Sequence, residues 1–529
     1  MITNIHTFAE SKMVKFFIFL AAFLTLFYSY ELNRRTNYPP QSVHCWRQAD
    51  GAAQALNYYQ NNLQFWKPGV LNVITNNHHT VGEFPIFYWL AAVLYKIFGV
   101  HEWILRSIHL IVFFIGIYHL FKLSDALLQN TVAALAIALL PFTTPVIAFY
   151  SLNFLPNVPA LGLAFSGWYY FYKYIKDSKS KDWYICTGIF LLIALLKPTV
   201  LIAWVAIMVL YKIDVLRGYF FKNEPPIFQQ KWKMLPSFFI IIIAVIAWRV
   251  WSEHYNVAAG SKMFFLDTIL PIWDMDIKSR QLITSWLRYY GLPIHVFTQT
   301  SLQILAAILV LNFILIKKQN KILFSILILN LLGVAAVILL WYQQLMIHDY
   351  YYIEWMVLPI SMLISLFYVF KQFNNKYLYY LLTVLMCCFL VKNFGHTKKE
   401  MFHRYDQKGD FYNDYNYSLF KTPQLQLFFK GLGISERDTV LSVPDVSPNA
   451  SLYWMRLRGF TNWNAGKYNF SPYQGHITSF YVDDIIKNHG CKYLILNNLK
   501  CQEADTLRPY RKDLLGVFDS SVYVYKLHK

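Results

Sequence analysis

Charged residues are scarce in this 529-residue chain: Asp, Glu, Lys and Arg together make up 15% of it, whereas a soluble globular chain carries about 25%. Cysteine is scarce too, and six cysteines in a chain of this length exclude a disulfide-stapled scaffold. Apolar residues, in contrast, reach 56%, above the about 45–50% that is usual in soluble proteins. Soluble, disordered, collagenous and disulfide-scaffold proteins are therefore excluded.

The apolar residues gather in long runs that approach or reach the roughly 17–25 residues needed to cross a bilayer. The clearest runs are Phe16–Tyr30, Pro236–Trp251, Ser301–Ile316 and Ile322–Trp341. The sequence therefore predicts a polytopic α-helical membrane protein.

Basic residues outnumber acidic ones by 48 to 29, which gives a formal net charge of +19. In a soluble chain this excess would suggest nucleic acid as a partner. Here the basic residues are dispersed among many short loops, as expected for cytoplasmic loops near anionic lipid. We therefore expect these basic residues to interact with membrane lipids and not with nucleic acid.

We predict about eleven spans, with the N-terminus inside and the C-terminus outside. The expected spans are residues 14–31, 103–122, 131–150, 154–172, 183–196, 199–213, 235–251, 301–316, 323–341, 354–370 and 377–392. This order puts the plainly basic loops on the inner side, as the positive-inside rule requires. These loops are Lys173–Lys181, Lys212–Lys233, Lys317–Lys321 and Lys371–Lys376.

The apolar segment Phe84–Phe98 is not counted as a span. Its fifteen residues are short for a crossing, and counting it would move every later basic loop to the outside. We expect a re-entrant or interfacial helix at the outer face instead. Three large segments, residues 32–102, 252–300 and 393–529, then share that face.

The chain is expected to divide into a transmembrane domain, residues 1–392, and an outer domain, residues 393–529. In the second part, apolar runs shorten to strand length and alternate with helical stretches, which predicts a small α/β domain. The strand-length runs are Thr439–Val443, Lys492–Leu496 and Val522–Leu527. Cys491 and Cys501 lie here on the oxidising side, where either a disulfide or two unpaired thiols would fit.

An ionisable side chain at the membrane boundary costs free energy, so each one calls for a structural or functional explanation. On the predicted topology, four short stretches that carry them end at the outer face. They are Trp46–Asp50 (WRQAD), Gly82–Pro85 (GEFP), Lys197-Pro198 and His348–Tyr352 (HDYYY). The carboxylates of Asp50 and Glu83 could accept a proton. An anionic phosphate could be bound by hydrogen bonds from basic and aromatic side chains. The candidates for this contact are Arg47, Lys197, His348 and Tyr351.

The two carboxylates also have structural explanations. Asp50 could cap a helix that starts at Gly51, and Glu83 could lie at the start of the next helix, where negative charge is favourable. The adjacent histidines His78 and His79 lack a defined ligand set, so no metal site is expected.

The later stretches have structural explanations as well. Lys197 could extend to the interface while Pro198 only separates two helices. His348 and the tyrosines after it could belong to an interfacial aromatic belt.

Taken together, these stretches resemble the membrane-embedded C-type glycosyltransferases, and in particular the protein O-mannosyltransferase and lipid A aminoarabinose transferase branch. The resemblance rests on short motifs and covers residues 14–392 in outline. The motifs are WRQAD at 46–50, GEFP at 82–85 with the aromatic helix after it, Trp103–Arg106, LLKP at 195–198 and HDYY at 348–351 with Leu358-Pro359 after it.

The resemblance implies that a sugar is transferred, with inversion, from a polyprenyl-phosphate carrier to a lipid, glycan or protein acceptor on the outer face. Asp50 would act as general base and Glu83 would help to position a substrate. The resemblance assigns Arg47, Lys197, His348 and Tyr351 to the donor phosphate, without a metal or other cofactor. It also favours a bacterial inner membrane, with the site facing the periplasm.

The chain departs from the family at three positions. Phe84 precedes Pro85 where the aminoarabinose branch has lysine, Gly51 follows Asp50 where the mannosylating branch has glutamate, and Asn157 stands where relatives often have aspartate. These departures leave the acceptor class open.

Two other functions remain as alternatives. One is a polysaccharide ligase or polymerase of the cell envelope, which would use arginines in its outer loops more than carboxylates. The other is a transporter or flippase, which should carry ionisable residues midway along several spans, whereas most of the spans predicted here are uncharged at their centres.

Overall fold

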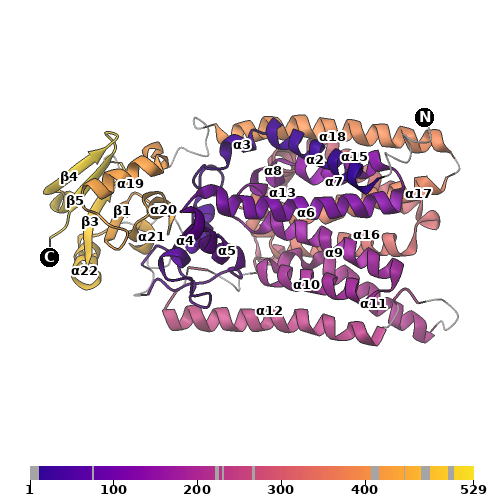
Figure 1. The fold of residues 1–529 in the computed structure, drawn as a ribbon, viewed down its shortest axis with the longest axis horizontal. Coiled ribbons are helices and arrows are strands. Elements are labelled where there is room, and N and C mark those ends of the chain that lie inside the picture. Colours follow the sequence, from indigo (N-terminus) through magenta and orange to yellow (C-terminus); the bar gives the residue numbers. More distant parts are fainter. Residues whose placement is uncertain are drawn as a thin grey trace.

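The computed structural model describes residues 11–73, 77–220, 226–228, 231–261, 263–264, 269–373, 375–406, 416–445, 447–465, 477–498 and 505–528. Most of this chain forms a bundle of long helices that lie side by side, with a mixed sheet at one end of the bundle (Figure 1). The first helix begins at the opposite end, so the two termini lie far apart along the long axis.

Ten of the predicted spans overlap one long helix each, whereas residues 131–150 cover two short helices that are bent relative to each other. The bundle helices are α2 (Lys12–Ser29), α6 (Glu102–Leu128), α7 (Thr131–Leu139), α8 (Pro145–Ser151), α9 (Asn157–Asp177), α10 (Ser180–Leu196), α11 (Ile202–Phe220), α12 (Lys231–Ala259), α13 (Ile277–Trp286), α14 (Leu292–His295), α15 (Gln299–Ile314), α16 (Lys321–Leu340), α17 (Val357–Gln372) and α18 (Lys376–Tyr405).

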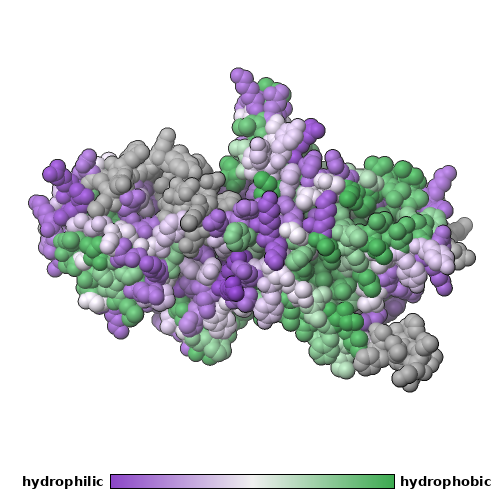
Figure 2. Space-filling view, turned by 90° about the horizontal axis from the view of Figure 1, so that it is seen from above, coloured by the Kyte–Doolittle hydropathy of each residue, from purple (hydrophilic) through white to green (hydrophobic). Residues whose placement is uncertain are grey.

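Among the described residues, seven helices are long and apolar enough to cross a membrane, or up to nine if each of two bent pairs is one span. The pairs are bent by 79° within residues 131–151 and by 99° within residues 277–314. Apolar side chains gather over the bundle on the face drawn in Figure 2. The chain is an integral membrane protein. The total of eleven spans and the orientation of the termini stay predictions.

Glycines allow the backbones of α6 and α9 to cross in contact. A Cβ atom at Gly116 would lie 2.2 Å from the carbonyl oxygen of Gly162 and 2.3 Å from its Cα. Small residues at a crossing let membrane helices approach closely. The first residue of α6, Glu102, contacts Arg456, which follows α20 (Ala450–Met455) in the C-terminal part of the chain.

Two shorter helices, α4 (Cys45–Gln60) and α5 (Ile86–Phe98), lie between the bundle and the sheet (Figure 1). With 13 residues, α5 is about 20 Å long, which is too short to cross a hydrocarbon core of about 30 Å. This agrees with the prediction that Phe84–Phe98 is not a span.

The sheet has five strands in the order β2-β1-β3-β5-β4. Its strands are β1 (Thr439–Val443), β2 (Arg458–Thr461), β3 (Cys491–Leu496), β4 (Asp513–Phe518) and β5 (Val522–Lys526). The pairs β1–β2 and β1–β3 are parallel, and the other two pairs are antiparallel. The three strand-length runs predicted from the sequence coincide with β1, β3 and β5.

Helices α19 (Thr422–Gly431), α20 (Ala450–Met455), α21 (Asn462–Ala465) and α22 (Ser479–His489) complete this C-terminal domain. The helix α18 runs unbroken to Tyr405, past the expected boundary at residue 393, and the division of the chain into two domains stays a prediction. The side chain of Cys491 is buried. Cys501 lies outside the described residues, so the pairing of these two cysteines stays a prediction.

The C-terminal domain packs against α4 and α5 through one hydrophobic core, to which Ala53, Tyr95 and Trp454 all belong. A buried ion pair joins Arg456 Nη2 to both carboxylate oxygens of Glu102, at 2.7 and 2.8 Å. Helices α4 and α5, the start of α6 and the C-terminal domain therefore form one packed unit at the end of the bundle.

We predict that Gly116→Ala lowers the free energy of unfolding by about 1–3 kcal/mol, because the added methyl group would overpack the contact between α6 and α9. Thermal unfolding of the purified protein in detergent measures the change. Gly188→Ala is the matched control, since a Cβ at Gly188 meets nothing within 4 Å and alanine favours a helix by about 0.5–1 kcal/mol. Equal stability of the two variants would contradict the close crossing.

Candidate active site

The motif WRQAD lies on α4, which begins at Cys45 with His44 at its N-cap position. Asp50 is therefore in the second turn, and the prediction that it could cap a helix is wrong. Residues three and four apart share one face of a helix, so Arg47, Asp50 and Gly51 project to the same side. The side chain of Asp50 is only 2% exposed.

Gly51 has a packing role beside Asp50. A Cβ atom at this position would lie 2.8 Å from the carbonyl oxygen of Phe154 and 3.0 Å from Cε1 of Tyr88. No side chain fits without moving the backbone at Phe154. This close approach is the physical reason why a glutamate could not follow Asp50 here.

Glu83 is held as an anion by two donors. Arg47 Nη2 lies 2.7 Å from Oε1 and 2.6 Å from Oε2, and the hydroxyl of Tyr88 donates to Oε1. Burial alone would raise the pKa of Glu83, but Arg47 and the Tyr88 hydrogen bond outweigh it, and the pKa is lowered. The helix α5 has no acidic residue in its first turn. The alternative role of Glu83 at a helix start is therefore not what its contacts support.

Arg47 has a second terminal nitrogen that its contact with Glu83 does not use. Both of its bonds to Glu83 come from Nη2, and its buried Nη1 has no hydrogen-bond partner within the described part of the chain. Unpaired buried donors are rare in folded proteins and indicate a missing partner. The guanidinium of Arg47 is thus fixed by Glu83 and free to donate to a ligand.

Asp50 has the properties of a proton acceptor near neutral pH. Asn449 Nδ2, from the C-terminal domain, donates to its Oδ1 over 2.8 Å. Burial raises the pKa of Asp50 to about 7, against the opposing effects of Arg47 and the Asn449 hydrogen bond. No hydrogen bond between described residues engages Oδ2. A base is most effective when its pKa is near the working pH, which favours Asp50 over Glu83.

Lys197 lies directly after α10, at the break that Pro198 imposes. The break is tied to the GEFP motif, because the amide of Phe84 donates to the carbonyl of Leu195 over 3.3 Å. Lys197 Nζ lies 4.9 Å from the ring centroid of Tyr351. The ammonium thus faces an aromatic ring within the protein, which does not support a lysine that only extends to the interface.

His348 lies in a cluster of rings that joins the HDYY motif to WRQAD. Its ring centroid is 5.2 Å from that of Tyr350, 5.4 Å from that of His44 and 5.8 Å from that of Trp46. Burial, with further contributions from the charges around it, lowers the pKa of His348 to about 3. The imidazole is therefore neutral and can bind a phosphate only through a hydrogen bond. Nδ1 of His348 has no hydrogen-bond partner among the described residues.

The tyrosines of this motif do not form a lipid-facing belt, because Tyr350 and Tyr352 are buried. Tyr351 is half-buried, beside Lys197. The structure thus brings together the six side chains that the sequence analysis singled out. They are Arg47, Asp50, Glu83, Lys197, His348 and Tyr351.

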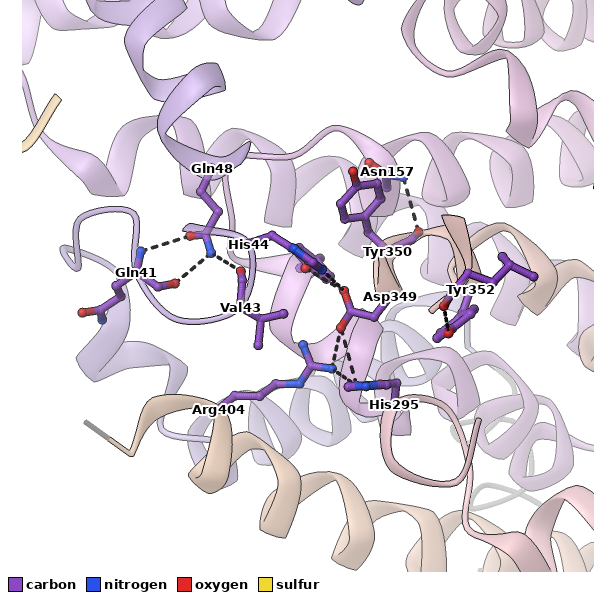
Figure 3. Close-up of polar contacts among 12 residues, drawn as sticks. Gln41, Val43, His44, Gln48, Asn157, His295, Asp349, Tyr350, Tyr352 and Arg404 are labelled. Carbon is purple, nitrogen blue, oxygen red and sulfur yellow. Dashed lines mark hydrogen bonds and ion pairs between the residues drawn. The ribbon is translucent and has the colours of Figure 1, made fainter. Parts of the chain in front are cut away.

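Asp349, for which the sequence predicted no role, is the centre of a buried polar network (Figure 3). One carboxylate oxygen lies 2.7 Å from Arg404 Nη2 and the other accepts the Tyr150 hydroxyl at 2.8 Å. His44 Nε2 and His295 Nδ1 lie 3.4 and 3.6 Å from this carboxylate. Asp349 therefore holds His44, the N-cap residue of α4, beside the ring of His348.

Glu354 lies five residues after Asp349 in the chain, and the sequence predicted no role for it either. Its carboxylate is fully buried, and Oε1 accepts from Asn157 Nδ2 at 3.2 Å and from the Thr199 hydroxyl at 3.0 Å. Lys197 Nζ lies 3.9 Å from the same oxygen. An aspartate at position 157 would face Glu354 as a like charge, which explains why asparagine is suited to this environment.

Comparisons with known proteins give a consistent result. Residues 78–251 match the family model of dolichyl-phosphate-mannose-protein mannosyltransferases. The crystal structure of ArnT from Cupriavidus metallidurans in the apo state is 9% identical, with a TM-score of 0.60 over 96% of this chain and 97% of that one. ArnT bound to undecaprenyl phosphate is 10% identical, with a TM-score of 0.61 over 98% of each chain. No curated protein matches the chain by sequence.

We predict that Asp349→Asn destabilises the protein by about 3–5 kcal/mol, because the buried charge of Arg404 loses its partner. The free energy of unfolding in detergent is the measurement. The control is Asp125→Asn, which breaks the partly exposed pair between Lys15 and Asp125 and should change stability by at most about 1 kcal/mol. If the two losses were equally small, Asp349 would not be the centre of this network.

Proposed function

We propose that the chain belongs to the C-type membrane glycosyltransferase superfamily, and that it transfers a sugar from a polyprenyl-phosphate-linked donor to an acceptor hydroxyl at the membrane surface. The observation that carries this proposal is the convergence, at one end of an apolar bundle, of basic and acidic side chains from four separate segments. Arg47 comes from α4, Glu83 from the segment before α5, Lys197 from the break after α10, and His348 from the segment before α17.

The position of these side chains suits a lipid-borne phosphate. Such a donor keeps its isoprenoid chain in the bilayer and its phosphate at the surface, so an enzyme that uses it needs cationic groups at that depth. Arg47 Nη1 and Lys197 Nζ are the donors that we assign to the phosphate, with neutral His348 and Tyr351 beside them. That ArnT has been crystallised with undecaprenyl phosphate supports this choice of carrier.

The reaction needs a base and a stabilised leaving group. In the proposed step, the carboxylate of Asp50 takes the proton of the acceptor hydroxyl while the acceptor oxygen forms a bond to the anomeric carbon. The bond from that carbon to the phosphate oxygen breaks, and its electron pair leaves with the phosphate. Attack from the face opposite the phosphate inverts the anomeric configuration. General base catalysis contributes roughly 10²–10⁴-fold and a well-placed charge roughly 10²–10³-fold.

Glu83 has a different task from Asp50 in this scheme. Both of its oxygens are engaged and its pKa is lowered, so it orients Arg47 rather than taking a proton. We propose further that the enzyme lies in a bacterial inner membrane with this end of the bundle in the periplasm. Its acceptor is a lipid, glycan or protein of the envelope.

We predict that Asp50→Asn keeps the protein folded and lowers sugar transfer by about 10²–10⁴-fold. The assay offers purified enzyme a panel of undecaprenyl-phosphate-linked hexoses and pentoses, with envelope lipids, glycans and peptides as acceptors, and measures the undecaprenyl phosphate released. Because the base acts in its ionised form and the pKa of Asp50 is about 7, the wild-type rate should rise with pH through about 7 and then level off. Full activity of Asp50→Asn would remove Asp50 from the mechanism.

Lys197→Ala is predicted to lower kcat/KM for the donor by about 10²-fold, because the phosphate loses one of its two cationic partners. The matched control is Lys122→Ala. Lys122 Nζ also lies over a tyrosine ring, 4.4 Å from the centroid of Tyr169, but twenty residues along α6, which is about 30 Å from its first residue. An equal loss in both variants would argue for a structural role of Lys197.

A further inference from the structure

Asn449 stands at the N-cap position of α20, yet its side chain does not cap that helix. An asparagine at this position usually accepts a hydrogen bond from the first turn. Here the amide of Ala450 donates to Ser447 Oγ at 3.0 Å, and the amide of Ser451 donates to Asp445 Oδ2 at 2.8 Å. Two neighbours thus satisfy the helix start and leave the side chain of Asn449 available for other contacts.

The orientation of the Asn449 amide group is fixed by a partner on each side. Its Oδ1 accepts the backbone N–H of Asn72 at 3.1 Å, and its Nδ2 donates to Asp50 Oδ1 at 2.8 Å. A flipped amide would face a donor with a donor and a carboxylate with an oxygen. The contacts therefore determine that an N–H group points at Asp50.

The partner on the other side, Asn72, is itself held by the C-terminal domain. Its Nδ2 donates to the carbonyl of Pro448 at 2.7 Å and to Asn464 Oδ1 at 2.8 Å. The backbone around Asn72 continues the sheet beyond β2, because the amide of Val73 donates to the carbonyl of Gly459 at 2.8 Å. A rigid sheet edge thus determines where Asn449 meets Asp50.

We propose that Asn449 is a positioning residue for the sugar transfer: its amide occupies Oδ1 of Asp50 and turns Oδ2 toward the acceptor hydroxyl. This inference rests on the proposed role of Asp50 as base. It makes the C-terminal domain a part of the catalytic centre rather than a cover over it. Hydrogen bonding to a carboxylate also favours its ionised form.

Several charged or titratable groups face Asp50 from different elements. Arg47 on the same helix and Asn449 from the C-terminal domain favour the ionised carboxylate. Burial, Glu83 and Asp445 oppose it, and Tyr88 on α5 also interacts with it. Removing the Asn449 donor while leaving the other groups in place should therefore raise the pKa of Asp50.

The pH profile of sugar transfer tests this inference, measured with the donor and acceptor that react fastest in the panel. We expect Asn449→Ala to shift the rising limb toward alkaline pH by about one unit, so that the rate falls about tenfold well below the limb and recovers toward the wild-type value above it. Asn449→Leu keeps the approximate size of the side chain and loses the donor without adding a second charge beside Asp50. It should shift the limb in the same direction, and it provides the comparison if the alanine variant does not fold.

Asn497→Ala is the matched control. Asn497 is a buried asparagine of the same domain whose Nδ2 donates to Ser442 Oγ at 2.9 Å, so its loss should lower stability without moving the pH profile. Unchanged profiles in both Asn449 variants, with Asp50→Asn inactive, would overturn the role of Asn449 and leave the proposed function standing. An active Asp50→Asn enzyme would overturn the base and this inference together.

Discussion

The ion pair between Arg47 and Glu83 is the interaction on which the arrangement of the site depends. Both side chains are mostly withdrawn from solvent, and a buried charge is tolerated only when an opposite charge and hydrogen bonds compensate it. The pair joins α4 to the segment before α5, and the amide of Phe84 joins that segment to the end of α10. The position of Lys197 relative to Asp50 therefore follows from one compensated pair of charges and one backbone hydrogen bond.

Contacts with residues distant in sequence account for two of the three positions at which the chain departs from the family that it resembles. Gly51 is required by the approach of the Phe154 carbonyl, and Asn157 donates to the buried carboxylate of Glu354. Neither residue indicates a different reaction. At each of the two positions, a neighbour that is distant in sequence restricts which side chain fits.

Sequence patterns predicted the long apolar helices and three of the five strands, because apolar periodicity and run length are local properties. They also identified the short polar motifs, since an ionisable residue at a membrane boundary is conspicuous. They could not identify Asn449, which lies 399 positions from Asp50, or Arg404, which the predicted end of the last span left outside the bundle. An asparagine in a polar loop carries no local signal that it will contact a carboxylate. Arg404 was missed because α18 continues to Tyr405, several turns past residue 392, where the hydropathy suggested its end.

In the proposed reaction, the burial of Asp50 explains how one carboxylate can act as the base beside another that stays ionised. Glu83 and Asp50 face the same guanidinium, but Glu83 receives the hydrogen bonds of both Arg47 and Tyr88, whereas Asp50 receives one from an uncharged amide. Desolvation is therefore fully offset at Glu83 and only partly offset at Asp50, so the two pKa values move in opposite directions from similar starting points. A pair of acidic residues with separated pKa values allows one to remain a fixed charge while the other exchanges a proton. The C-terminal domain takes part in that separation, since it supplies the amide of Asn449 that donates to Asp50.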